Sequence, residues 1–450
     1  MPQKPEQLEL PFANRGEAPK GGRSAESSTT ATEIERPGAD ALMEVICEED
    51  NLRRAWKRVK RNGGAPGVDG MTVEELPEYL RREWPRIREE LLAGTYQPKP
   101  VRRKSIAKDG GGERRLGIPV VLDRFIQQAI LQILQPQWDP TFSPHSYGYR
   151  PGRSAHDAVR QAQEYVEQGR TWVVDIDLEQ FFDRVNHDVL MGRVAKRIRD
   201  RRLLRLIRRY LEADMMVGGV VMDRDEGAPQ GGPLSPLLAN LLLDEVDKEL
   251  EKRGHAFVRY ADDCNVYVRS EKAGQRVMNG LRRQYARLRL RINESKSQVA
   301  RVAKRKFLGF TLYRYRQVAR LRIADKSLAK MRRHVRKLTR PVVGRSLAQV
   351  CQNLNTYLRG WKAYFRLAGT PKQWKTLDAW IRQRLRALRL RQWRHPKTIY
   401  RRLRALGVTD EVARKTAASA GRWWHTATHM GRIALPNRYF DELGLCRLES

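Results

Sequence analysis

Cysteine is scarce in this sequence, and its four residues stand far apart, at Cys47, Cys264, Cys351 and Cys446. This spacing excludes a disulfide framework and a cysteine-rich zinc module, and it favours a reducing compartment. Long apolar runs are also missing, because the longest near-continuous one, around residues 234–243, is far shorter than the roughly 20 residues of a transmembrane helix. The first residues lack a basic-then-apolar signal pattern. We therefore expect a soluble, intracellular protein with no membrane partner.

Acidic residues are few relative to basic ones. The sequence has 52 Asp and Glu against 88 Lys and Arg, which leaves a formal net charge of +36 in 450 residues. Such an excess indicates a polyanionic partner. A generically basic enzyme or a membrane-surface protein is the alternative, but no amphipathic anchor stands out. Nucleic acid is thus the leading partner class before any motif is considered.

The length predicts two to three domains. Residues 1–40 are rich in Pro, Gly, Ser, Thr and Glu and contain one aromatic, Phe12, so we expect a disordered leader. Helical spacing of apolar residues follows over residues 42–59, before a Gly-rich loop. Residues 171–268 alternate β-rich strings with helical stretches, which predicts an α+β region. After about residue 325, long Arg-rich, Leu-spaced segments predict a separately packed helical part.

Two adjacent acids, Asp262 and Asp263, follow Tyr260 and Ala261 between two β-type strings, so they occupy the tip of a predicted hairpin. The ordinary interpretation of a lone pair of this kind is a solvated turn. A further acid, Asp177, changes this interpretation, because it ends another β-rich string. We therefore consider the acids together.

If the two strings are neighbours in one sheet, Asp177, Asp262 and Asp263 can hold two Mg²⁺ ions about 3.5 to 4 Å apart, as two-metal phosphoryl transfer requires. Clustered carboxylates repel one another unless a cation offsets them. Asp175 competes for this role, because it lies on the same strand face as Asp177. The spacing to Phe181-Phe182-Asp183 favours Asp177.

A series of motifs in a fixed order resembles the reverse transcriptases encoded by bacterial group II introns, which are also maturases. The motifs occupy residues 64–70, 114–119, 146–154, 171–177, 228–236, 260–263, 293–296 and 307–310. The resemblance begins at about residue 45 and extends to the C-terminus. Any one motif could arise by chance, whereas the ordered set is highly specific.

The resemblance implies an α+β, right-hand polymerase fold with a helical thumb. Fingers with an N-terminal extension would span residues 41–165, the palm 166–325, the thumb or maturase domain 326–405 and a C-terminal nucleic-acid-binding region 406–450. It also implies the short form without the His-Asn-His nuclease domain of many relatives, and therefore no nicking of the target strand. The location would be the prokaryotic cytosol, in a nucleoid-associated ribonucleoprotein.

The activity implied is RNA-directed DNA polymerisation. Such a protein binds its group II intron RNA, assists splicing, and copies the intron into DNA from an RNA template, a DNA primer or target and deoxynucleoside triphosphates. Two alternatives stay open: a non-enzymatic RNA-binding splicing factor with the palm as scaffold, and a domesticated relative in phage defence or DNA repair. The intact set of aspartates argues against the first alternative, since a pure binder does not need it.

Five further residues gain nucleotide-binding roles from the resemblance. Phe182 would lie under the sugar and exclude a 2′-hydroxyl, although an ordinary core aromatic is the alternative. Lys108 and Arg114 flank a Gly turn and would reach the triphosphate. Gln230 would lie against nucleotide and template. Lys296 would protonate the pyrophosphate or serve as a counter-charge.

RNA binding is expected of the helical part. The segment 355–365 resembles the family's maturase or thumb segment and contains Arg359, Trp361 and Lys362. Independently of the resemblance, an Arg-rich stretch lies between Trp380 and Trp393, where cations can bind phosphates and aromatic faces can stack on bases. Its arginines include Arg382, Arg384, Arg386 and Arg389. The alternative is a solvated basic face with the tryptophans in the core.

His425 and His429 have the spacing of helix-borne metal ligands. The expected Glu between them is absent, and only Cys446 is close in sequence. We expect no metal at these two histidines.

Overall fold

The computed structural model describes residues 41–107, 113–217, 220–222, 227, 231–341 and 344–449. The chain forms two compact units, Met1–Ser154 with Val174–Val299, and Ala155–Val173 with Ala300–Ser450. This division does not follow the expected domain ranges, which stay a prediction. The expected disordered leader lies outside the described residues.

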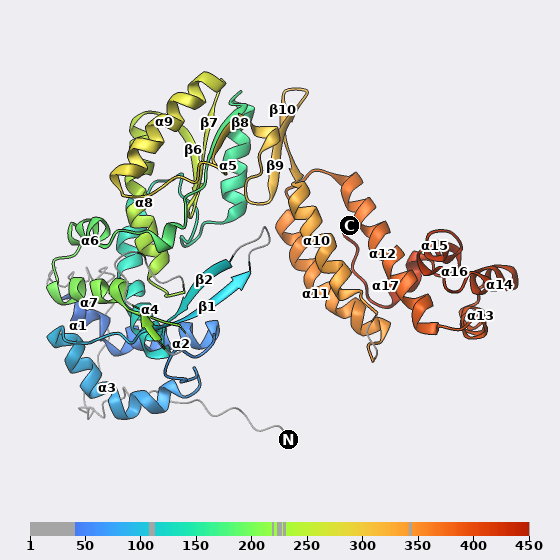
Figure 1. Cartoon of the computed structure of the whole chain (residues 1–450), viewed down its shortest axis with the longest axis horizontal. Helices are drawn as coiled ribbons and strands as arrows, with labels where there is room; N and C mark the ends of the chain where they lie inside the picture. The colour runs from blue at the N-terminus through green and yellow to red at the C-terminus, as the bar shows by residue number, and fades with distance from the viewer. Residues whose placement is uncertain are drawn as a thin grey trace, which may run out of the picture. The chain divides into compact units, whose positions relative to one another are not determined.

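The N-terminal part of the first unit is formed mainly by helices, coloured blue to cyan in Figure 1. They are α1 (Leu42–Ile46), α2 (Glu49–Asn62), α3 (Leu76–Ala93) and α4 (Val121–Trp138). The single helix expected over residues 42–59 is thus two, with a break at Cys47 and Glu48. Helix α2 buries Leu52, Trp56 and Val59 on one face, packs on α4, and ends at Gly63 with a φ of 58°.

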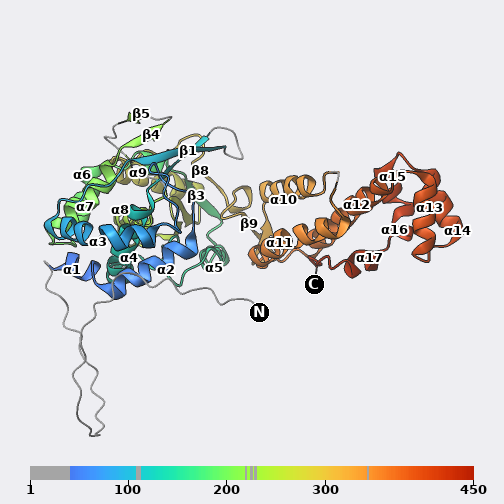
Figure 2. The same ribbon diagram turned by 90° about the horizontal axis from the view of Figure 1, so that it is seen from below.

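A four-stranded sheet lies near these helices in the same unit. Its order is β2-β1-β4-β5, with β1 (Val101–Ala107), β2 (Glu113–Ile118), β4 (Met215–Val217) and β5 (Val220–Met222). Strands β1 and β2 form an antiparallel hairpin, and β4 pairs parallel to β1 (Figure 2). Helices α6 (His187–Ala195) and α7 (Arg201–Glu212) precede β4 and pack on each other.

A second sheet carries the acidic residues. Its order is β6-β7-β3-β8, with β3 (Trp172–Ile176), β6 (Ala256–Tyr260), β7 (Asp263–Val268) and β8 (Gln298–Arg301). Helices α8 (Ser235–Lys252) and α9 (Glu271–Arg287) pack on β6 and β7. The strings expected to be strands at residues 171–177, 257–260 and 265–268 correspond to β3, β6 and β7, and the mixture of helices and sheets confirms the α+β prediction.

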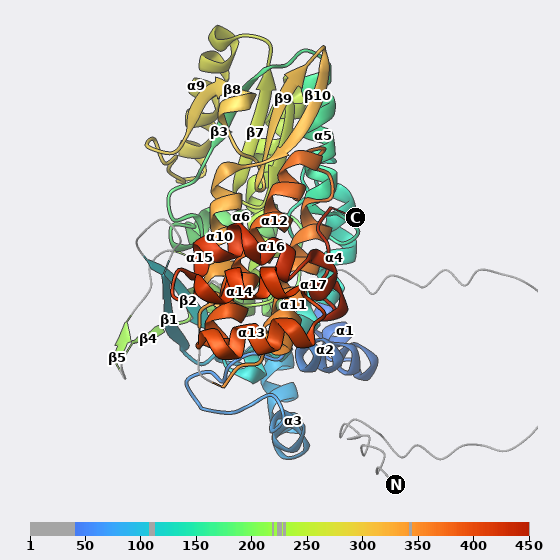
Figure 3. The same cartoon turned by 90° about the vertical axis from the view of Figure 1, so that its right-hand side faces the viewer.

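The second unit joins a hairpin to a series of helices. Helix α5 (Ala155–Glu167) packs on the antiparallel hairpin of β9 (Phe310–Tyr315) and β10 (Val318–Ile323). The helices that follow are α10 (Asp325–Leu338), α11 (Leu347–Phe365), α12 (Pro371–Trp393), α13 (Pro396–Ala405), α14 (Asp410–Ala418), α15 (Trp423–Thr428), α16 (Met430–Ala434) and α17 (Asn437–Glu442). Helices α13 to α16 form a cluster whose members pack on one another and on α12 (Figure 3). This series confirms the helical C-terminal part expected after residue 325.

Across the described residues, none of the helices combines the length and the apolar character that a membrane span requires.

Candidate functional site

Strands β3 and β7 are neighbours, and side-chain contacts fix their relative direction. When the Asn265 amide nitrogen faces β3, it donates to Asp175 Oδ1 over 2.9 Å. On the other face of the sheet, a Cβ placed on Gly274 would lie 3.5 Å from Val268 Cγ2 and 3.6 Å from Val174 Cγ2. Val268 and Val174 therefore lie close together. If the strands were parallel, the Asp175–Asn265 pair would place Val268 opposite residue 178, roughly 13 Å from Val174. The strands are therefore antiparallel.

This direction brings the predicted metal-binding acids to one edge of the sheet. Asp177 lies just past the end of β3, and Asp263 is the first residue of β7, each two residues beyond the Asp175–Asn265 pair. Because side chains alternate along a strand, both acids share the face of that pair. Asp262, in the turn before β7, is half-buried, whereas Asp263 is exposed.

The chemistry of this donor set suits Mg²⁺. Carboxylate oxygens are the ligands that this ion prefers, and in phosphoryl-transfer sites one or two of them are supplemented by water and substrate phosphates. No three Asp, Glu, His or Cys groups among the described residues lie close enough to form a complete metal cluster by themselves. The acids at this edge fit an ion that takes part of its oxygen ligands from a nucleotide.

Asp177 is fixed through its backbone by the loop before β8. Its N–H donates to Ser297 Oγ over 3.0 Å, and its carbonyl accepts from the Asn293 N–H over 2.8 Å. Lys296 Nζ lies 3.5 Å from Asp177 Oδ1, with the Lys296 side chain 60% exposed. An exposed pair at this distance contributes little to stability. Lys296 is thus a largely exposed cation beside the acid.

A cavity of about 640 Å³ lies in the first unit. Its lining includes Phe182, Tyr149, Gly231, Gly232 and Ser235. Tyr149 follows Gly148, where a Cβ would lie only 2.2 Å from the Ala261 amide nitrogen, so a lining residue of the cavity is one residue away in sequence from a contact with the turn that carries Asp262.

Phe182 lies in η2 (Phe181–Asp183), five residues after Asp177. Its ring meets that of Phe181 edge-on at 5.0 Å. Phe181 is only 3% exposed and belongs to the core, whereas Phe182 is half-buried and lines the cavity. The core alternative thus describes Phe181, and Phe182 has a surface that a ligand can reach.

The other predicted nucleotide-binding residues are only partly described. Lys108 and Gln230 lie outside the described residues. Arg114 belongs to β2, where its backbone is opposite Ile106, and its side chain lies outside the described part of the chain. Their roles stay predictions.

The structure corrects the expectation for two of the arginines on α12. Arg382 and Arg386 are only 2% and 4% exposed, so their guanidinium groups do not face solvent. Arg382 donates to Asp378 and to Asp441, each over 3.0 Å. Arg386 donates to the Leu435 carbonyl over 2.7 Å, and burial lowers its pKa to about 10. Both arginines hold the C-terminal segment against α12.

The remaining predicted RNA-binding side chains differ in accessibility. Arg384 and Arg389 are half-buried and lie over the rings of Trp380 and Trp393, at 5.5 and 5.0 Å. Arg359 on α11 is exposed. Among these three residues Arg359 is the exposed one, whereas Arg384 Nε donates to Thr339 Oγ1 over 2.8 Å.

Two further residues of the expected maturase segment take part in packing. Trp361 is 9% exposed and packs its ring on Phe365 and Trp374, so it belongs to the helical core. Lys362 Nζ donates to the Arg447 carbonyl over 3.2 Å.

The two C-terminal histidines lie side by side, with their rings 4.6 Å apart at His425 and His429. No third Asp, Glu, His or Cys joins them in a metal-binding group within the described residues. The N–H of Cys446 instead donates a hydrogen bond to the Asn355 side-chain oxygen, over 2.8 Å.

Comparison with protein families gives two matches in this order along the chain. Residues 106–312 match the reverse transcriptase (RNA-dependent DNA polymerase) family, and residues 328–407 match the group II intron maturase-specific domain. These matches confirm the resemblance inferred from the sequence motifs.

Individual relatives agree with the family matches over part of their length. Protein YkfC of Escherichia coli (strain K12) is 40% identical over 218 residues, which are 47% of this chain and 57% of that protein. The group II intron-encoded protein LtrA of Lactococcus lactis subsp. cremoris is 35% identical over 208 residues, 46% of this chain and 34% of LtrA. The chain thus spans little more than half of the first relative and about a third of the second.

A solved structure described as a partial Cas6-RT-Cas1–Cas2 complex is also similar. It is 26% identical, covers 57% of this chain and 43% of its own, and has a TM-score of 0.36.

Proposed function

We propose that this chain, which combines a reverse transcriptase domain with a group II intron maturase-specific domain, is an RNA-directed DNA polymerase that binds a group II intron RNA, assists its splicing and copies it into DNA. The observation that carries the proposal is the shared edge of β3 and β7. There Asp177 and Asp263 share one face of the sheet, Asp262 lies in the turn before β7, and a cavity of about 640 Å³ in the same unit is lined by Phe182 and Tyr149. Acids at neighbouring strand ends, in the same unit as a nucleotide-sized space, suit phosphoryl transfer.

The acids have the simplest role in this proposal. Asp177, Asp262 and Asp263 would hold two Mg²⁺ ions, which when bound promote attack by the primer 3′-hydroxyl and neutralise the leaving pyrophosphate. The backbone bonds of Asp177 to Ser297 and Asn293 keep its carboxylate at the edge before any ligand arrives.

Residues of the cavity would select and orient the nucleotide. Phe182 presents its ring where a sugar would lie, so a 2′-hydroxyl would collide with it. Lys296, beside Asp177, would act as a counter-charge for the pyrophosphate or as its proton donor. Lys108, Arg114 and Gln230 would contact the triphosphate and the template, as the resemblance implies.

The second unit would bind the intron RNA. Its predicted RNA-binding cations with some exposure are Arg359, which is exposed, and Lys362, Arg384 and Arg389, which are half-buried, and the high charge of the chain supports a polyanionic partner. Arg382 and Arg386 are removed from this set, because both are buried.

Primer extension on an RNA template with deoxynucleotides and Mg²⁺ tests the polymerase. We expect extension by the wild type and none by Asp262→Asn combined with Asp263→Asn. Asp188→Asn, which alters an exposed aspartate on α6, should extend like the wild type. A wild type that binds structured RNA tightly without extending a primer would favour the non-enzymatic splicing factor instead.

A further inference from the structure

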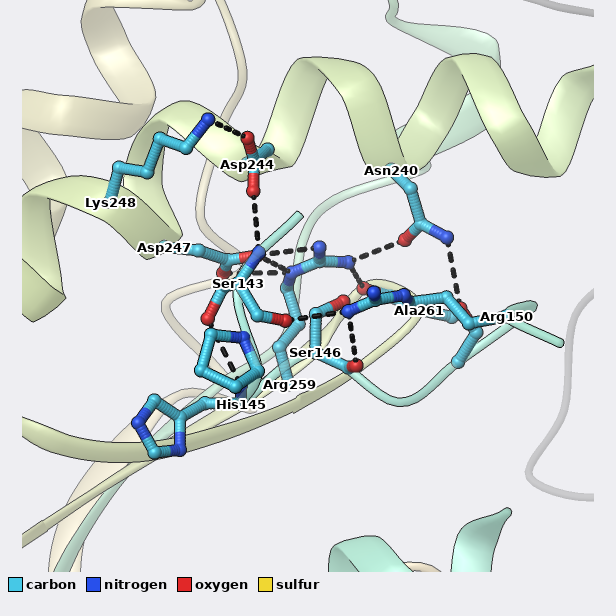
Figure 4. A network of polar contacts seen from close by, with 12 residues as sticks. Ser143, His145, Ser146, Arg150, Asn240, Asp244, Asp247, Lys248, Arg259 and Ala261 are labelled. Carbon is cyan, nitrogen blue, oxygen red and sulfur yellow. Dashed lines mark hydrogen bonds and ion pairs between the residues drawn. The ribbon is translucent and has the colours of Figure 1, made fainter. Parts of the chain in front are cut away.

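Behind the acidic turn lies a fully buried ion pair. Arg259 on β6 and Asp247 on α8 are 1% and 0% exposed. Arg259 Nε donates to both carboxylate oxygens of Asp247 over 2.9 Å, and its Nη2 donates to Oδ2 over 2.6 Å (Figure 4). Neither residue was singled out from the sequence, although Arg259 directly precedes Tyr260.

The same guanidinium group reaches the turn itself. Arg259 Nη1 donates over 2.9 Å to the Asn240 side-chain oxygen and over 2.9 Å to the carbonyl of Ala261, the residue before Asp262. Asn240 and Asp247 are seven residues apart on α8 and therefore share one face of that helix. One arginine thus joins two points of a rigid helix to the turn.

A second contact holds the turn from its other side. Asn240 Nδ2 donates over 2.9 Å to the Gly148 carbonyl. Gly148 has no side chain, and a Cβ there would lie 2.2 Å from the Ala261 amide nitrogen. The carbonyl of Ala261 is thus bonded to Arg259, and its amide nitrogen lies close to Gly148.

Ala261 needs such support. Its φ is 57°, in the left-handed region that residues with a side chain rarely adopt. Conformations of this kind persist when the surrounding structure imposes them, and they gather at functional sites. A relaxed turn would direct the two following carboxylates elsewhere.

We infer that Arg259, Asp247 and Asn240 are positioning residues, which hold Ala261 in its left-handed conformation so that Asp262 and Asp263 are directed to the edge shared with Asp177. The inference rests on the proposed function of those acids. Burial of charge alone gives no reason for the pair, since well-packed apolar residues often replace a buried ion pair without loss of stability. The contact to the Ala261 carbonyl supplies a geometric reason.

The test is Mn²⁺ binding, followed by electron paramagnetic resonance. The sample is the full chain with an RNA template, a chain-terminated primer and the next deoxynucleotide, so that no turnover occurs. Asn240→Ala keeps the Arg259–Asp247 ion pair and removes the hydrogen bonds that Asn240 makes to Arg259 and to the Gly148 carbonyl. Loss of a residue that orients metal ligands weakens metal binding by about tenfold or more, and we expect a change of this size.

Asn51→Ala is the matched control. Asn51 is 1% exposed, like Asn240, and its amide donates to the Ile46 and Ala129 carbonyls in the same unit. We expect this variant to lose stability while it binds Mn²⁺ like the wild type. Equal Mn²⁺ affinity of Asn240→Ala and Asn51→Ala would overturn the inference.

Arg259→Lys provides a second measurement if Asn240→Ala does not fold. A lysine keeps the charge opposite Asp247, but its compact ammonium group lacks the planar fork that spans Asn240 and the Ala261 carbonyl. We expect the same loss of Mn²⁺ affinity, and wild-type affinity would contradict the role of Arg259. A wild type that binds no Mn²⁺ would instead refute the proposed function of the acids.

Discussion

At the scale of single residues, Phe181 and Phe182 show how one step along the chain separates packing from function. Phe181 is 3% exposed in the core, and its neighbour Phe182 lines the cavity. Adjacent aromatics in a single turn of 3₁₀ helix point in different directions, so both environments can be served by consecutive residues.

Phe182→Ala is expected to admit ribonucleotides. Removing the ring opens the space that a 2′-hydroxyl needs, and steric discrimination of this kind is on the order of tenfold to a hundredfold. Single-nucleotide insertion, measured as kcat/KM for a deoxynucleotide and for its ribonucleotide, gives the ratio directly.

Phe181→Leu serves as the control for Phe182→Ala. It perturbs the neighbouring core aromatic, so it should lower stability and leave the sugar preference of the wild type. An unchanged preference in Phe182→Ala would remove Phe182 from the nucleotide site.

At the scale of elements, α4 carries a buried acid whose ionisation opposes folding. Asp123 accepts hydrogen bonds from the Tyr96 hydroxyl over 2.8 Å and from the Lys99 N–H over 3.1 Å. Burial raises the pKa of Asp123 from 3.8 to about 7 despite these bonds. The carboxyl group therefore stays protonated in the folded chain over a range where the unfolded chain releases the proton.

The sign of the resulting pH dependence follows from linkage. The stabilisation of the folded chain by protonated Asp123 is fully present below pH 3.8, the pKa in the unfolded chain, and is lost as the pH rises toward about 7, the pKa in the folded chain. Between pH 5 and 7 the free energy of unfolding should fall less steeply in Asp123→Asn than in the wild type. The two slopes should differ by up to about 1.4 kcal/mol for each pH unit. Urea unfolding at a series of pH values measures both slopes.

Asp188→Asn is the control for the pH experiment, because it removes the same charge from an exposed position. The pKa of Asp188 is lowered by its hydrogen bond to Arg208, so this group titrates well below pH 5. Between pH 5 and 7 the free energy of unfolding of Asp188→Asn should depend on pH as that of the wild type does. If Asp123→Asn also follows the wild type, Asp123 is ionised in the folded chain.

Helix α12 shows why an Arg-rich stretch does not define a binding surface by itself. Arg382 and Arg386 are four residues apart, so they share one face, and that face meets the C-terminal segment with Leu435 and Asp441. The partners are more than forty residues away in sequence. Periodicity can indicate the shared face, but the identity of its neighbours comes from the folded chain.

At the scale of the whole molecule, the net charge of +36 predicts RNA binding that weakens steeply with salt. Buried and exposed arginines should contribute differently. For Arg359→Ala we expect weaker RNA binding and a smaller slope of log affinity against log salt, by about 0.7 to 0.9 for each phosphate that the protein no longer neutralises. Filter binding of a structured RNA at several salt concentrations measures the slope.

For Arg382→Met we expect the opposite of Arg359→Ala, namely a loss of stability without a change in RNA binding. Removing one partner of a buried pair leaves Asp378 with an unpaired charge, so the free energy of unfolding should fall by about 3 to 5 kcal/mol. The folded protein should bind RNA with the same slope of log affinity against log salt as the wild type. A reduced slope would return Arg382 to the RNA-binding set.

The sequence by itself determined the features that depend on local pattern. Alternating and clustered β-formers predicted the strands around Asp177 and the hairpin that carries Asp262 and Asp263. Helical spacing predicted the helices after residue 325, and the order of the motifs indicated the resemblance that the two family matches confirm. These features follow from neighbours along the chain, so periodicity, turn residues and charge were sufficient.

Only the tertiary structure decided which residues meet across long separations. It brought Asp247 and Asn240 to Arg259 beneath the Ala261 turn, placed Gly148 against the same turn, and turned Arg382 and Arg386 inward. An arginine has the same intrinsic preferences at every position. Whether it faces solvent or a buried carboxylate depends on desolvation and on a partner that the fold supplies.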